Sequence, residues 1–261
     1  MKAQHTKRKA GPAVLAIDAG NTRIKWGIHD GARWRRQASL ETARVSGLKA
    51  ALARAPAPRV IVISNVAGAA VSEKLRRALP AAESVLWIKS ERMQCGVRSS
   101  YAQPAQLGCD RWAALIGAYR LFGAASVVVN AGTALTVDAL TADGVFAGGM
   151  IVPGADLMRR ALADNTAGLK LRPGAFSFFP DATGDAIMSG AINASCGAIE
   201  RMARFLEEAG QVQPLCVLSG GGAALLAPHL ILAVKVVDNL VLEGLLTIAA
   251  GVANPAAKRT D

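Results

Sequence analysis

The sequence contains few aromatic residues and only three histidines, and its four cysteines follow no pairing pattern. Because Phe, Trp and Tyr make up only 5% of the chain, aromatic platforms on which nucleic-acid bases stack are not expected. The cysteines show no CxxC spacing and form no ligand pattern with the histidines, which argues against a structural zinc site and against a disulfide framework. We expect reduced, mostly buried thiols at Cys95, Cys109, Cys196 and Cys216.

Long apolar runs are also absent, because charged or amide residues such as Asp18, Asn130, Asp238 and Glu243 interrupt them. No segment is therefore expected to cross a membrane. Residues 1–12 are basic, but the apolar run that follows ends at Asp18 and is too short for a secretory signal. We expect a basic disordered tail over residues 1–12, no membrane partner and, by default, a cytoplasmic location.

The net charge is +11, and part of it lies in the two terminal segments. The positive charge that remains on the folded body suits an anionic substrate and permits weak nonspecific binding of nucleic acid. The sequence shows no helix-turn-helix signal, no basic strip interleaved with aromatic residues and no zinc module. A specific nucleic-acid partner is therefore not expected.

One pattern occurs twice: a short apolar run followed by an acid or its amide, Ala, Gly and small polar residues. The first copy spans Val14 to Lys25 and the second spans Val127 to Thr136. Each apolar run predicts a buried strand, and the glycine permits a tight turn whose N–H groups can hold an anion. Each copy alone also fits an ordinary hairpin turn. Two copies about one small domain apart favour a duplicated fold that holds a phosphate.

The order of the remaining patterns predicts an α/β fold in two similar halves. We expect one domain over residues 13–124, a second over 125–252, and a terminal tail over 253–261. A loop is expected from Cys95 to Gln106, before a helix that opens at Gly108. Asp18 ends the first strand, which is a suitable place to hold Mg²⁺ through water.

Asp110, at the start of the predicted helix, is either a helix cap or a functional carboxylate. Asp is a favoured N-cap residue, and a capping carboxylate accepts backbone hydrogen bonds that lower its pKa. Such a carboxylate is a weak base, which phosphoryl transfer tolerates because orientation of the hydroxyl matters more than proton removal. The neighbouring Cys109 is either a small buried residue or a thiol whose alkylation would block the site.

Taken together, five motifs resemble those of the type III pantothenate kinases, the group that includes the Bvg accessory factor. The likeness spans about residues 13–250. Any one motif is weak, and their occurrence in this order is specific. The motifs are Asp18-Ala19-Gly20-Asn21-Thr22 with Lys25, Gly108-Cys109-Asp110-Arg111, Gly132-Thr133-Ala134 with Thr136, Gly148-Gly149-Met150-Ile151-Val152-Pro153-Gly154, and Ser219-Gly220-Gly221-Gly222.

The resemblance implies two ribonuclease-H-like domains of the acetate and sugar kinase, heat-shock chaperone and actin superfamily, with the nucleotide in the interdomain cleft. It also implies a homodimer that uses ATP and Mg²⁺ to phosphorylate pantothenate to 4′-phosphopantothenate, the first step of coenzyme A biosynthesis. Similar enzymes often also need K⁺ or NH₄⁺.

The resemblance also implies roles for single residues. The first phosphate loop for ATP corresponds to Asp18, Ala19, Gly20, Asn21, Thr22, Arg23, Ile24 and Lys25. The second corresponds to Gly132 and Thr133, and the turn against adenosine to Gly220 and Gly221. The pantothenate-binding positions are Tyr101, Gly108, Cys109, Asp110, Arg111 and Thr183, of which Thr183 reaches the substrate from the other subunit. Asp110 resembles the catalytic base, and Arg111 would bind the substrate carboxylate or its neighbourhood.

Asn130 departs from the family pattern, because many relatives carry at this position an Asp that helps to hold the monovalent cation. An amide oxygen is a weaker ligand for a hard cation, so we expect weak K⁺ dependence or none. Two other functions fit the same fold: a different small-molecule kinase of the superfamily, acting on a sugar or acetate, or a regulatory protein without kinase activity. The motifs at Tyr101 and at residues 108–111 argue against the first.

Overall fold

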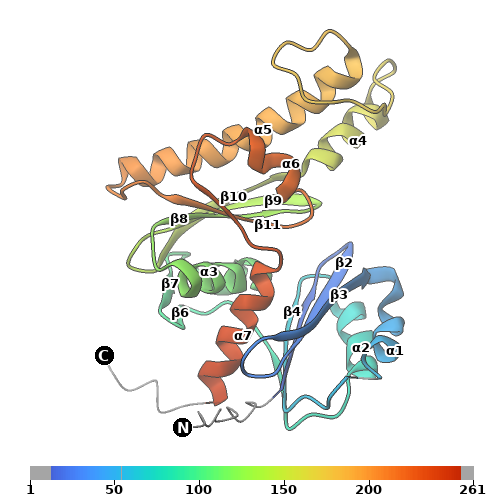
Figure 1. The fold of residues 1–261 in the computed structure, drawn as a ribbon, viewed down its shortest axis with the longest axis vertical. Helices are drawn as coiled ribbons and strands as arrows, with labels where there is room; N and C mark the ends of the chain where they lie inside the picture. The colour runs from blue at the N-terminus through green and yellow to red at the C-terminus, as the bar shows by residue number, and fades with distance from the viewer. Residues whose placement is uncertain (1–12, 54, 254–261) are drawn as a thin grey trace, which may run out of the picture. The chain divides into compact units, whose positions relative to one another are not determined.

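The computed structural model describes residues 13–53 and 55–253, which form two compact units (Figure 1). The first unit contains residues 13–89 and 245–253, and the second contains residues 90–244. Each unit is built on one β-sheet with helices packed against it, which confirms the predicted α/β class. No helix among the described residues is long and apolar enough to span a membrane.

The first sheet has five strands in the order β3-β2-β1-β4-β5. β1 pairs antiparallel with β2 and parallel with β4, while β2–β3 is antiparallel and β4–β5 parallel. The central strands β1 and β4 are buried on both faces, which explains why their sequences are nearly continuous apolar runs. The strands are β1 Val14–Ala19, β2 Arg23–His29, β3 Trp34–Glu41, β4 Val60–Asn65 and β5 Ser84–Trp87.

Short helices cover this sheet. Leu48 and Leu75 are fully buried and join the apolar core formed by β1, β2 and β4. In α2 the charged residues Lys74, Arg76 and Arg77 are exposed, because Leu75 and Ala78 take the positions that face the core. The helices are the 3-10 helix η1 Thr42–Gly47, α1 Leu48–Leu52 and α2 Ala69–Ala78.

The second sheet has seven strands in the order β12-β11-β8-β9-β10-β7-β6. Its strands β10-β9-β8-β11-β12 repeat the order and the relative directions of β3-β2-β1-β4-β5, so the predicted duplication is present. The strands are β6 Met93–Gln94, β7 Val97–Ser99, β8 Ser126–Ala131, β9 Ala134–Leu140, β10 Val145–Pro153, β11 Leu215–Ser219 and β12 Val234–Val236.

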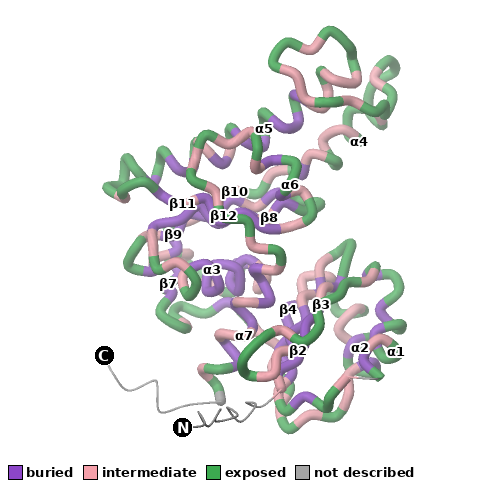
Figure 2. The backbone as a smooth tube through the Cα atoms, in the orientation of Figure 1, coloured by how far each residue is buried: buried purple, intermediate pink, exposed green. Residues whose placement is uncertain are grey.

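Helices α3 and α5 lie on opposite faces of the second sheet (Figure 1). α3 is buried along most of its length, whereas α5 buries one face against β8, β9 and β11 (Figure 2). The helices of this unit are η2 Pro104–Gln106, α3 Cys109–Phe122, α4 Ala155–Asn165, α5 Thr183–Glu208, α6 Ala223–Leu226, η3 Ala227–His229, and the first turn of α7 Leu240–Ala253.

The structure differs from the sequence prediction in the segment from Cys95 to Gln106. This segment is not a simple loop, because β7 pairs with β10 and adds an edge to the second sheet. The compact units also do not coincide with the predicted boundary after residue 124. Since α3 packs against β8 and β9, residues 90–124 belong to the second unit. Residues 1–12 and 254–261 of the predicted tails lie outside the described part of the chain.

Two glycines let the start of α7 approach α3 closely. A Cβ atom on Gly244 would lie 1.8 Å from the carbonyl oxygen of Ala113, and one on Gly117 would lie 2.7 Å from that of Leu240. The two helix backbones are therefore in direct contact at this crossing, which no larger residue would permit.

This crossing gives a prediction with a matched control. Gly244→Ala should destabilise the protein by about 1–3 kcal/mol, because the backbones must move apart. Gly197→Ala, on the exposed side of α5 with no neighbour within 4 Å, should stabilise it by roughly 0.5–1 kcal/mol. Thermal unfolding measures both changes, and equal melting temperatures for the two variants would contradict the close crossing.

Candidate active site

The first glycine turn joins β1 to β2 in the first unit. The N–H of Gly20 donates to the carbonyl oxygen of Arg23 at 3.0 Å, which closes the turn. Thr42 anchors it: its hydroxyl donates to the Gly20 carbonyl at 2.7 Å, and its N–H donates to the Thr22 carbonyl at 3.0 Å. The tip residues Asn21, Thr22 and Arg23 are exposed, so the turn is rigid at its base and open to a ligand at its tip.

Asp18 and Lys25 are partners in the register of β1 and β2. Directly opposed residues of antiparallel strands project from the same face of a sheet, so a carboxylate and an ammonium group lie side by side below this turn. This arrangement can hold a phosphate together with a cation.

The second glycine turn joins β8 to β9 and is one residue shorter than the first. Gly132 donates to the carbonyl oxygen of Ala134 at 3.0 Å, and the tip residue Thr133 is exposed. Gly154, at the end of β10, donates to the Thr133 carbonyl at 2.9 Å. A Cβ on Gly154 would lie 2.1 Å from the Gly132 carbonyl, so this glycine is required for the approach.

The glycine turn after β11 contacts the second turn directly. Gly222 donates to the carbonyl oxygen of Ala131 at 2.9 Å. Gly220 has a φ of +97°, and a Cβ there would lie 2.4 Å from the same carbonyl and 2.7 Å from Oδ1 of Asn130. The structure therefore brings together Asn130, the second glycine turn and the predicted adenosine turn.

Asp110 does not cap α3, contrary to the N-cap interpretation. Gly108 is the N-cap residue, and Asp110 lies in the first turn, where its Oδ1 accepts the N–H of Arg111 at 2.8 Å. Burial raises the pKa of Asp110, and the hydrogen bond and charge of Arg111 oppose that rise without cancelling it. Asp110 is consequently a stronger proton acceptor than a capping carboxylate would be.

The side chain of Arg111 is buried and forms an ion pair with Asp138 of β9, a residue that the motifs do not include. Only 8% of the Arg111 side chain and 2% of the Asp138 side chain are exposed. Nε of Arg111 lies 3.2 and 3.1 Å from the two Asp138 oxygens, and Nη2 donates to Oδ1. Burial would lower the pKa of Arg111, but its interactions with Asp138 and with Tyr101 together outweigh burial and raise it.

Tyr101 lies beside this pair. Its ring packs 5.1 Å from that of Phe146, and the guanidinium of Arg111 lies 5.9 Å from the Phe146 ring. Arg92 holds the segment in place by donating to the carbonyl oxygens of Ser99, Tyr101 and Ala102 at 2.8–3.1 Å. The predicted substrate residues Tyr101, Asp110 and Arg111 therefore belong to one cluster, which also includes Gly108 and Cys109 at the start of α3.

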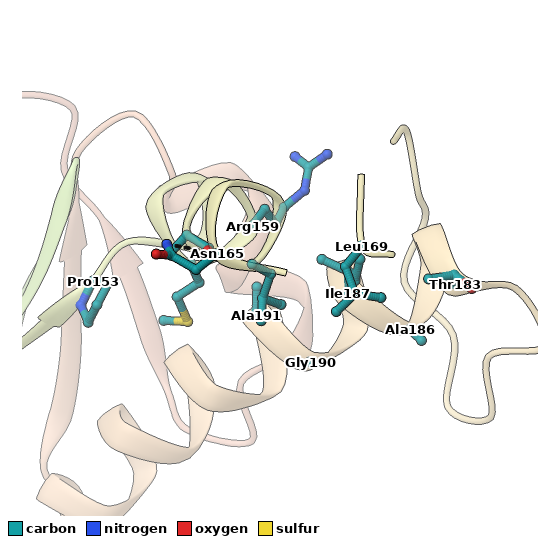
Figure 3. A pocket seen from close by; sticks show the side chains of 12 residues that line it. Pro153, Arg159, Asn165, Leu169, Thr183, Ala186, Ile187, Gly190 and Ala191 are labelled. Carbon is teal, nitrogen blue, oxygen red and sulfur yellow. Dashed lines mark hydrogen bonds between the residues drawn. The ribbon is translucent and has the colours of Figure 1, made fainter. Parts of the chain in front are cut away.

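Thr183 lies elsewhere in the second unit, at the first residue of α5. It lines one end of an apolar groove of about 750 Å³ between α4 and α5, with Pro153 at the other end (Figure 3). Between them, Met158, Leu162, Leu169 and Ile187 supply most of the apolar lining.

Comparison with known proteins places this chain in a family. The family model described as type III pantothenate kinase matches residues 14–204. The type III pantothenate kinase of Nitrosospira multiformis is 48% identical over 91% of this chain and 91% of its own length. That of Aromatoleum aromaticum is 50% identical over 90% of this chain and 97% of its own length.

Solved structures support the fold. MreB5 of Spiroplasma citri, bound to ADP, matches with a TM-score of 0.55 at 11% identity, covering 94% of this chain and 98% of its own. The activator of 2-hydroxyisocaproyl-CoA dehydratase from Clostridium difficile matches with a TM-score of 0.50 at 14% identity, covering 95% and 98%. The predicted superfamily fold is confirmed, and the chain belongs to the type III pantothenate kinases, which phosphorylate pantothenate in coenzyme A biosynthesis.

Proposed function

We propose that Asp110 is the general base in the transfer of the γ-phosphoryl group of ATP to the 4′-hydroxyl of pantothenate. The hydroxyl oxygen attacks the γ-phosphorus, the bond from that phosphorus to the β–γ bridging oxygen breaks, and ADP leaves. The hydroxyl proton passes to the Asp110 carboxylate. The observation that supports this role is the raised pKa of Asp110 beside a buried ion pair, since a base is most effective when its pKa approaches the working pH.

The other members of the cluster are proposed to bind pantothenate. Arg111 offers directed N–H donors to the carboxylate or its neighbourhood, and Tyr101 contributes its ring and hydroxyl. Gly108 and Cys109 supply backbone N–H groups at the start of α3, where the helix dipole favours an anionic ligand. Binding at these points would hold the reacting hydroxyl against Asp110.

The two glycine turns are proposed to bind the phosphates of ATP, and Gly220 and Gly221 to lie against adenosine. Both turns have exposed tips, and in each the glycine N–H donates a hydrogen bond within the turn, which supports a shared task. Because coenzyme A biosynthesis consumes ATP, we place the reaction in the cytoplasm.

A divalent metal is implied by the family, and Mg²⁺ suits the residues present. Among the described residues no group of three or more His, Cys, Asp or Glu side chains could hold a metal. Mg²⁺ needs no such cage, because it keeps several waters and is bound through one or two carboxylates and the substrate phosphates. Asp18 would hold it through water, and the bound ion would neutralise charge on the transferred phosphoryl group.

The general-base role predicts the activity of Asp110→Asn. Turnover should fall by about 100-fold or more, because the amide cannot accept the hydroxyl proton. In the wild type, kcat/KM should decline as the pH falls through the pKa of Asp110. This pKa lies above the usual value for an aspartate. A coupled assay of pantothenate-dependent ADP formation tests both points, with the exposed Asp143→Asn as a control of unchanged rate. Normal turnover of Asp110→Asn would remove Asp110 from the mechanism.

The raised pKa of Asp110 also predicts how the thermal stability of Asp110→Asn depends on pH. Since the folded-state pKa of Asp110 is raised, the folded protein loses stability as the pH rises through that pKa, and the stability is fully present only below the unfolded pKa. Asp110→Asn should therefore melt at a higher temperature than the wild type near neutral pH. The difference in melting temperature should shrink as the pH falls toward the pKa of an ordinary aspartate. A lower melting temperature at neutral pH would contradict the raised pKa.

Weak dependence on K⁺ is proposed from Asn130, whose amide oxygen packs at Gly220 instead of offering a carboxylate. The rate should be similar in K⁺ and Na⁺ at fixed ionic strength. Asn130→Asp restores an anionic oxygen of the same size, so its rate should rise when K⁺ replaces Na⁺. Strong stimulation of the wild type by K⁺ would overturn this proposal.

A homodimer is proposed, with the groove between α4 and α5 covered by a second copy of the chain. In the segment that precedes α5, Phe178 and Phe179 are 85% and 93% exposed. Their segment is fixed to α5, because Ala175 donates its N–H to Asp185 and Ser177 donates its N–H to Ser189. Exposed aromatic rings on a segment that is held in place are typical of a protein interface. In such a dimer Thr183 would reach the partner's pantothenate.

Sedimentation of the purified protein tests the dimer. The wild type should sediment as a dimer, and the double variant Phe178→Ser, Phe179→Ser should dissociate at a concentration where the wild type does not. Phe205→Ser, at an exposed aromatic position near the other end of α5, should leave the dimer intact. A monomeric wild type at micromolar concentration, or equal dissociation of both variants, would contradict this interface.

A further inference from the structure

We propose that Asp138 is a positioning residue for the reaction. It orients the guanidinium of Arg111 toward pantothenate and fixes the position of Arg111 relative to Asp110. The inference rests on the proposed roles of Asp110 and Arg111. Asp138 stands in the middle of β9 between the buried residues Val137 and Ala139, and it is not part of the sequence motifs.

The contact between Asp138 and Arg111 fixes one edge of the guanidinium. Asp138 accepts from Nε and from Nη2, which are the two donors of the side-on, fork-like arrangement. Nη1 lies in the same plane at the opposite edge of the guanidinium, and the contacts to Asp138 do not involve it. A guanidinium held in this way offers a ligand donors of defined direction, whereas an arginine without its carboxylate could rotate about its last side-chain bonds.

The neighbouring strand β10 leaves room for this contact. Gly149 pairs with Asp138 in the antiparallel register. A Cβ on Gly149 would lie 2.0 Å from Oδ1 of Asp138 and 2.7 Å from Nη2 of Arg111. The carboxylate and guanidinium therefore occupy the space that a side chain on β10 would fill, which gives a physical reason for glycine within the Gly148–Gly154 motif.

The pair is coupled to Asp110 through the backbone and through charge. The N–H of Arg111 donates to the Asp110 carboxylate at 2.8 Å. A shift of Arg111 therefore moves a hydrogen-bond donor that the proposed base accepts from. The positive charge of Arg111 favours the ionised form of Asp110, whereas the Asp138 and Asp110 carboxylates repel each other. The charged and titratable groups of the cluster are Asp110, Arg111, Asp138, Tyr101 and Cys109.

The experiment is a double-mutant cycle on the full-length protein with Asp138→Asn, Arg111→Gln and the double variant. The constants measured are kcat and the separate KM values for pantothenate and ATP. In the wild-type background, Asp138→Asn should raise the pantothenate KM by about 10- to 100-fold, because a misdirected donor weakens substrate placement. The ATP KM should change little. In the Arg111→Gln background, Asp138→Asn should have almost no further effect.

A second readout separates positioning from a general loss of structure. Loss of the Asp138 charge removes a carboxylate that repels Asp110, so the acidic limb of the pH profile of kcat/KM should shift to lower pH in Asp138→Asn. Asp143→Asn, at an exposed carboxylate of the same unit, should leave the profile and both KM values unchanged. If Asp138→Asn does not fold, Asp138→Glu keeps the charge but moves the carboxylate, and the same rise in pantothenate KM is expected.

The outcomes distinguish the proposed role of Arg111 from that of Asp138. An Arg111→Gln variant with a normal pantothenate KM would refute the proposed role of Arg111 itself. If Arg111→Gln impairs pantothenate binding while folded Asp138 variants bind it normally, only the role of Asp138 is refuted. Equal losses from Asp138→Asn in both backgrounds would also overturn the inference, since Asp138 would then act without Arg111.

Discussion

The buried ion pair between Arg111 and Asp138 is the contact on which the candidate pantothenate site depends. A buried charge without its partner typically costs 3–5 kcal/mol, so neither residue can be changed without disturbing the other. The pair fixes the first turn of α3 against β9, and this turn carries Asp110. The ring of Phe146 and the segment of Tyr101 complete the surroundings of the guanidinium. Stability and the proposed recognition of pantothenate are thus combined in one interaction.

Close backbone contacts stabilise the glycine turns that are proposed to bind the nucleotide. Three chain segments meet around the second turn at Gly154, Gly220 and Gly222. A side chain on Gly154 or Gly220 would collide with a carbonyl oxygen. The first turn relies instead on the Thr42 side chain for its support. The two strand–turn–strand units are therefore stabilised in different ways. The hydrogen bond that closes the turn also differs, because Gly20 donates to the carbonyl three residues on and Gly132 to the carbonyl two residues on.

Much of this architecture could be predicted from the sequence, because its signals are local. The apolar runs before Asp18 and Asn130 and the glycines after them predicted both hairpins and the duplication. The position of β7 could not be predicted, since its pairing with β10 joins residues far apart in the chain. Asp110 was assigned two interpretations because burial, which raises its pKa, comes from tertiary packing. Asp138 was missed, although an acid inside an apolar strand is a signal for a buried partner.

Gly149 has a consequence for how this site can evolve. The acid on β9, the arginine on α3 and the glycine on β10 fit together as a set, and losing any one leaves either a buried charge without its partner or a steric collision. Single substitutions therefore lead through unstable intermediates. Descendants of this protein should keep all three residues or replace them jointly, so the three positions behave as one inherited unit even though they are far apart in the gene.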